Sequence, residues 1–165
     1  MFFDIIRLDF MILTPHILVG AAIGLRMKNP FLVFITAFLS HFVLDAIPHT
    51  EYDVSVLKEK PNKKFIAPCL KILVDFVCGL GIVFFISKTI LRLEPSYNLV
   101  LGIIFSVIPD AFTILFWQTK NKFFKNLTNF HIFHSKRIYP QAKPISKILG
   151  ILSQVIIGIL AIFVF

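Results

Sequence analysis

Five long apolar runs constrain the fold of this 165-residue chain more than any other feature. They cover residues 12–25, 31–48, 66–87, 97–117 and 145–165. The last three runs are long enough for a helix of about 20 residues to span a bilayer. The chain is 57% hydrophobic, above the roughly 45–50% apolar content of soluble proteins. The sequence therefore predicts an all-α, polytopic helical membrane bundle of about five apolar helices, forming one domain over residues 1–165.

The first two runs are shorter and are joined by a polar turn at residues 26–30. Pro30 in this turn suits the first position of the following helix. We therefore expect a short antiparallel helical hairpin, which either spans a thinned bilayer or is partly enclosed by the protein. Residues 1–10 are interpreted as an amphipathic lead-in, with Met11 as an alternative start.

Two polar segments, at residues 50–65 and 118–144, are interpreted as loops that carry ten Lys and Arg residues. With five spans, both loops and the N-terminus lie on one side, and the positive-inside rule makes that side cytoplasmic. The expected location is thus the cell (inner) membrane. The net charge is +8, but the basic residues flank apolar runs, which favours anionic lipid over nucleic acid as the main partner.

The two cysteines, Cys69 and Cys78, fall in the same apolar run. Nine residues of helix separate them by roughly 13 Å along the axis. This separation excludes a disulfide between them. We expect two buried thiols.

The second apolar run ends in polar residues that a lipid-facing helix does not need. His41 and Asp45 are four residues apart and share one helix face, and His49 follows one turn later. Ionisable side chains are costly in lipid and usually serve a function there. Imidazole and carboxylate groups are ligands for Zn²⁺, Mn²⁺ or Fe. The pattern therefore predicts a metal site.

Alternating helix directions place further ionisable residues at the same end of the bundle. These candidate ligands are His16, Asp75, Asp110, His131 and His134. The pocket they predict holds one or two divalent ions, Zn²⁺ first, with Mn²⁺ or Fe as alternatives. Lys136 and Arg137 follow directly and are candidate ligands for a substrate phosphate.

Each of these residues also has a purely structural interpretation. His41 and Asp45 can form an intramembrane pair, His49 can be interfacial, and Asp75 can pair with Lys71 one turn away. Hydroxyl residues of the fourth run, such as Ser106 and Thr113, are interpreted as ordinary polar residues of membrane helices.

Three short motifs carry a family resemblance: MILTPH at residues 11–16, SHFVLDAIPH at 40–49 and IPD at 108–110. Together they resemble the small bacterial membrane-bound metal-dependent hydrolases. The H-x-x-x-D element with its later His also resembles the helical core of zinc-dependent phospholipase C and its nuclease relatives, which cleave phosphoesters. The resemblance implies metal binding by His16, His41, Asp45, His49 and Asp110.

The leading hypothesis is a membrane-embedded hydrolase that cleaves a phosphoester, including that of a phospholipid, with a metal-activated water. Asp45 or Asp110 is the expected general base. The alternatives are a transport protein with a His/Asp ion pathway and a non-catalytic membrane scaffold. A transporter predicts ionisable residues spread through the membrane depth, whereas an enzyme predicts them gathered at one end.

Overall fold

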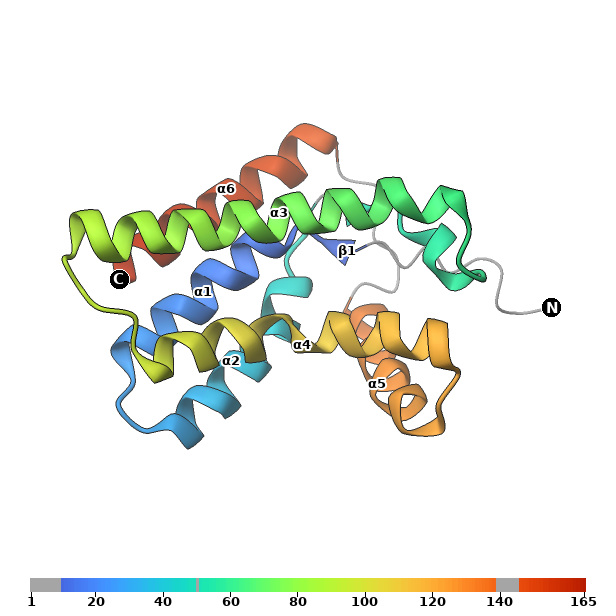
Figure 1. The fold of residues 1–165 in the computed structure, drawn as a ribbon, viewed down its shortest axis with the longest axis horizontal. Helices are drawn as coiled ribbons and strands as arrows, with labels where there is room; N and C mark the ends of the chain where they lie inside the picture. The colour runs from blue at the N-terminus through green and yellow to red at the C-terminus, as the bar shows by residue number, and fades with distance from the viewer. Residues whose placement is uncertain (1–9, 50, 139–145) are drawn as a thin grey trace.

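A computed structural model describes residues 10–49, 51–138 and 146–165, and these form a helical bundle (Figure 1). The described part has six α-helices: α1 (Leu13–Arg26), α2 (Pro30–Asp45), α3 (Ile66–Phe85), α4 (Tyr97–Thr119), α5 (Lys122–Ile138) and α6 (Lys147–Val164). Short elements connect them: β1 (Phe10–Met11), β2 (Glu51–Tyr52), the 3-10 turns η1 (Ser55–Lys58) and η2 (Lys63–Phe65), and the π turn η3 (Ile86–Ile90). The two strands are two residues each and pair antiparallel. The all-α prediction is confirmed.

The predicted hairpin of the first two apolar runs is present as α1 and α2. Pro30 occupies the first position of α2, where its missing N–H costs nothing. The side chain of Asn29 caps the helix by accepting a hydrogen bond from the backbone N–H of Phe31 at 2.9 Å.

Helix α1 lies at the centre of the bundle and packs against α2, α3, α4 and α6. Its contact with α4 is the closest, because glycines meet there. A Cβ on Gly102 would overlap the backbone carbonyl of Gly20, and a Cβ on Gly24 would overlap the backbone of Asn98. Small residues allow membrane-type helices to approach to backbone contact in this way.

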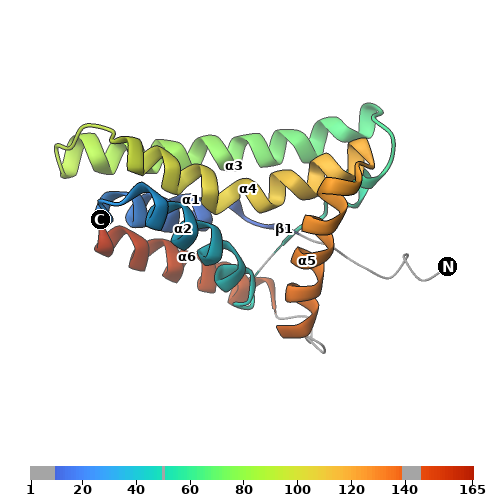
Figure 2. The ribbon, with the colours of Figure 1, turned by 90° about the horizontal axis from the view of Figure 1, so that it is seen from below.

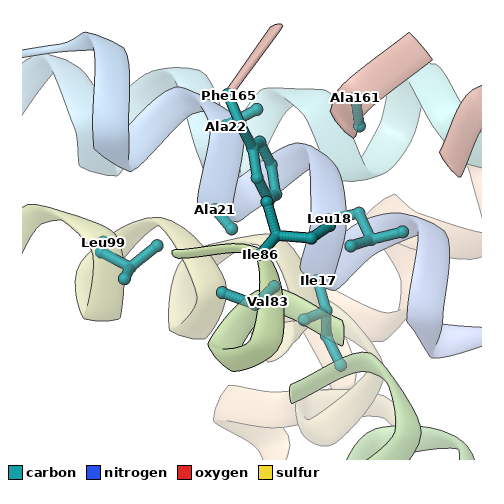
Figure 3. Packing of buried hydrophobic residues seen from close by; sticks show 9 residues of the cluster. All are labelled: Ile17, Leu18, Ala21, Ala22, Val83, Ile86, Leu99, Ala161 and Phe165. Carbon is teal, nitrogen blue, oxygen red and sulfur yellow. The ribbon is translucent and has the colours of Figure 1, made fainter. Parts of the chain in front are cut away.

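The main apolar core surrounds α1 (Figure 3). Its central residues, Ile17 and Ala21, are fully buried. Side chains from α3, η3, α4 and the end of α6 close around them, namely Val83, Ile86, Leu99, Ala161 and Phe165.

Two helical segments are long and apolar enough to cross a membrane: Lys63–Ile90, which contains α3, and Tyr97–Thr119, which is α4. Three apolar helices are shorter: α1, α2 and α6. The last run therefore gives a shorter helix than predicted, because Ser146 caps α6 through a hydrogen bond from the backbone N–H of Leu149. The outward faces of α3 and α6 expose large apolar side chains such as Leu70, Val77 and Leu160, a surface typical of lipid contact.

Residues 122–138, most of the segment 118–144 that the sequence predicted as a loop, form a helix, and residues 139–144 lie outside the described part. After α4, Lys120 adopts a left-handed conformation (φ 54°) and Asn121 caps the new helix α5 by accepting from the backbone N–H of Phe123. This helix forms because apolar and small residues recur at helical spacing within a basic segment. It packs on α4 and α2 and runs across the end of the bundle (Figure 2).

The prediction of buried thiols is also wrong, because both Cys69 and Cys78 are exposed. Helix α3 buries the stripe that contains Asp75, Gly79 and Val83 against the rest of the molecule. Both cysteines lie off that stripe.

Candidate metal centre

Four side chains from three helices meet beside the end of α2. His41 and Asp45 come from the last turns of α2, Asp110 follows Pro109 in α4, and His131 comes from α5. One donor atom from each residue lies within 4.8 Å of the donor atoms of the other three. We call these four residues the His/Asp group; their arrangement can hold a metal ion.

Asp45 contacts both histidines of the His/Asp group. Its Oδ2 lies 3.0 Å from Nε2 of His41 and 2.8 Å from Nε2 of His131. The two imidazole Nε2 atoms are 3.4 Å apart, and Nε2 of His41 is 3.7 Å from Oδ1 of Asp110. A tetrahedral ion with bonds near 2.0–2.1 Å has ligand atoms about 3.3 Å apart. The four separations above bracket that value, and all four donor atoms lie within 4.8 Å of one another.

The protonation of His41 follows from its other ring nitrogen. Nδ1 lies 2.9 Å from the backbone carbonyl oxygen of Ser106. A carbonyl can only accept, so Nδ1 carries the proton and donates it. In the neutral imidazole, Nε2 then presents a lone pair to the carboxylate of Asp45. Metal-binding histidines are commonly held by such a hydrogen bond from the second nitrogen to a carbonyl.

His131 has a comparable support. Its Nδ1 lies 3.3 Å from Oγ1 of Thr113. The Thr113 hydroxyl also lies 3.2 Å from the carbonyl of Pro109. When it donates to that carbonyl, its oxygen accepts from Nδ1–H of His131, and Nε2 of His131 is the atom that faces Asp45.

The His/Asp group is mostly buried, but part of its surface remains exposed. The side chains of Asp45 and His131 keep 10% and 13% of their surface exposed, whereas that of His41 is fully buried. Oδ2 of Asp110 is buried and finds no hydrogen-bond partner within the described residues. An unpaired carboxylate oxygen beside the group is a position where a ligand or a water would be held.

His16 lies next to the group. Its Nε2 is 3.3 Å from Oδ1 of Asp45, and its ring stacks on that of His41 with centroids 4.5 Å apart. The ring is fully buried. It therefore contacts the opposite oxygen of the carboxylate that His41 and His131 share.

Two other predicted ligands lie elsewhere. The Asp75 carboxylate caps the start of α1, where it accepts from the backbone N–H of Leu13 and from the hydroxyl of Thr14. It neither pairs with Lys71 nor joins the His/Asp group. His49 follows the end of α2, and its Nδ1 lies 2.6 Å from the carbonyl of Ile47. This local contact turns the ring toward its own backbone, and the structure does not bring it into the group.

His134, Lys136 and Arg137 lie in the last turns of α5. Their side chains are outside the described part of the structure. Their predicted roles in metal and phosphate binding therefore stay predictions.

The sequence interpretation missed the supporting roles of Ser106 and Thr113. Both are buried and lie within a turn of Asp110 on α4. Thr113 lies three residues after Asp110 on the same helix face, and this spacing is the signal that could have identified it. Ser106 acts through its backbone carbonyl, which no side-chain pattern signals.

Comparison with known proteins adds no assignment: no family model, no curated protein and no solved structure matches the chain.

Proposed function

We propose that this chain is a membrane-embedded, metal-dependent hydrolase that cleaves a phosphoester at the His/Asp group. The observation that carries the proposal is the hydrogen bond from Nδ1 of His41 to the carbonyl of Ser106. It leaves a lone pair of Nε2 facing the Asp45 carboxylate at 3.0 Å. A second proton on the ring or a cation must lie between them, and a second imidazole nitrogen 2.8 Å from the same carboxylate oxygen supports the cation.

The donor set of two imidazoles and two carboxylates supports Zn²⁺ as the ion, with Mn²⁺ or Fe as alternatives. His16 would extend the set on the far side of Asp45, where a second ion would bind. A divalent ion in such a site lowers the pKa of a bound water toward neutrality and stabilises charge on the leaving oxygen of a phosphoester.

The two carboxylates are suited to different tasks. Asp45 contacts imidazoles through both of its oxygens, so it acts as the shared ligand that organises the site. Asp110 has one oxygen near His41 and one without a partner among the described residues. Asp110 is therefore the proposed general base, because its second oxygen can accept a proton from a water.

Five ionisable side chains gather in one place, namely His16, His41, Asp45, Asp110 and His131. This gathering supports an enzyme over a transport pathway, which needs such groups along the membrane depth. Lys122 and Lys125, exposed on the α5 helix that carries His131, support a site at the cytoplasmic face of the cell membrane.

The test combines metal analysis with a rate measurement on the detergent-purified chain. We expect bound zinc, hydrolysis of p-nitrophenyl phosphate or bis(p-nitrophenyl) phosphate, and loss of both in the His41→Ala/Asp45→Ala double variant. The Asp110→Asn variant keeps a neutral amide oxygen at the site, so with zinc in excess it should still bind the ion while its rate falls by about 10²–10⁴, the usual contribution of a general base. The matched control is Asp53→Asn, which changes an exposed aspartate.

The proposal is wrong if the purified chain binds no divalent metal, which would favour the scaffold. Metal uptake into proteoliposomes without hydrolysis of either ester would favour transport.

A further inference from the structure

An apolar groove of about 320 Å³ opens between α3, the start of α1, η1 and the second half of α4. One wall is a stripe of α3 at helical spacing that includes Cys69, Ile72 and Phe76. The facing side chains include Leu13 and Ile114. Cys69 is exposed, so the groove opens on the outward face of a helix that is long and apolar enough to cross a membrane.

The groove and the metal centre occupy neighbouring turns of the same two helices. Ile114 follows Asp110 by four residues on α4, and Leu13 precedes His16 by three residues on α1. Residues at these spacings share a helix face, about one 5.4 Å turn apart. A molecule with its head at the His/Asp group would therefore have to reach about one helical turn to enter the groove.

We propose that the groove holds one alkyl chain of a lipid phosphoester whose phosphate lies at the His/Asp group. This inference rests on the proposed function and names its substrate class. The lining is apolar and offers no partner for a polar tail, and the volume is at the small end of the range of roughly 300–1,000 Å³ for ligand pockets. The opening on α3 lets a chain enter sideways from the bilayer.

The size of the effect follows from burial of the chain. Each buried methylene strengthens binding about fourfold, from its transfer out of water. Dodecyl phosphate should therefore bind at least about tenfold more tightly than butyl phosphate to the zinc-loaded chain, even with detergent competing for the groove.

The test uses dodecyl phosphate that carries a diazirine at the end of its chain, added to the full chain in maltoside micelles. After irradiation, mass spectrometry should place the label on α3 near Cys69 and Ile72 and on α4 near Ile114. Excess dodecyl phosphate should displace the label, and butyl phosphate should not. A label spread over the outward faces of α3 and α6, and not displaced by dodecyl phosphate, would overturn the proposal.

Matched variants test whether the alkyl chain lies in the groove. Ile114→Trp fills the groove and should reduce labelling at least about tenfold, whereas Leu115→Trp, at the adjacent exposed position of α4, should not. Since Ile114 also packs beside Trp117, Cys69→Trp closes the groove from α3, with Cys78→Trp as its control.

Zinc content separates this inference from the proposed function. If the groove variants keep zinc but are labelled like the wild type, the groove does not hold the alkyl chain, and the proposed metal centre is unaffected. A wild-type chain that binds no zinc refutes the proposed function itself, whatever the labelling shows.

Discussion

Replacing Thr113 by valine tests whether the His/Asp group is built to hold a metal. The Thr113 hydroxyl lies 3.3 Å from Nδ1 of His131 and has no other contact with the group among the described residues. Valine has nearly the same shape, and position 113 is buried with 2% of its surface exposed. The substitution therefore removes the orientation of one ligand and leaves the four ligands in place.

The magnitude follows from this geometry. Loss of a hydrogen bond that orients a metal ligand typically weakens metal binding by about 10–100-fold, or about 1.4–2.8 kcal/mol. The Thr113–His131 bond is long and neutral, so the lower end of that range applies. We expect the Kd for zinc to rise about tenfold.

The assay is competition of the purified chain against a chromophoric zinc chelator. Thr119→Val is the matched control, because the Thr119 hydroxyl also donates to the carbonyl four residues earlier, that of Leu115, at 2.7 Å. It should leave the Kd for zinc unchanged. The reasoning is refuted if Thr113→Val binds zinc within twofold of the wild type, or if both threonine variants weaken binding equally.

Three further predictions concern stability, each measured as thermal unfolding of the detergent-solubilised chain. Asp75→Ala should cost about 0.5–2 kcal/mol, because the carboxylate caps α1. Equal stability of this variant and Glu59→Ala, which changes an exposed carboxylate, would contradict that role. Gly102→Ala should cost about 1–3 kcal/mol from overpacking against Gly20. Gly81→Ala, with open space around it, should be neutral or stabilising. If Gly81→Ala were the more destabilising of the two, α1 and α4 would not meet as described. Removal of zinc with a chelator should lower the free energy of unfolding by about 2.7 kcal/mol relative to zinc at 100 times its Kd, and an unchanged midpoint would mean that no metal is bound.

The helices could be predicted from the sequence because apolar runs and end signals are local. Residues 26–30, for example, contain the end of α1 at Arg26 and the signals that start α2. Those signals are the Asn29 cap and Pro30 at the first helical position. Helix α5 was missed because its apolar residues are few and lie among lysines, so mean polarity hid the helical spacing. Local pattern also could not show that α3 exposes its cysteines, because that depends on which stripe of α3 meets α1.

The His41 and Asp45 pair could be predicted because both ligands lie on one helix, one turn apart. The assignment of the remaining ligands depended on helix packing. Asp75 and Asp110 are both carboxylates in apolar helices, yet one caps α1 and the other faces His41. Hydrophobic periodicity indicates which side of a helix is apolar, but it does not indicate which neighbouring helix packs against that side.

The glycine contact between α1 and α4 connects this packing to the chemistry of the site. Gly102 touches Gly20 at backbone distance, and Ser106, one turn later, presents the carbonyl that fixes Nδ1 of His41. Asp110 follows after another turn, on the same face. The close approach of α1 and α4 thus lies one turn from the carbonyl that sets the tautomer of His41. A larger residue at either glycine would displace α4 one turn before Ser106, and we expect this displacement to weaken the hydrogen bond that fixes the tautomer of His41. Both zinc affinity and stability should therefore fall in Gly102→Ala, whereas Gly81→Ala should lower neither.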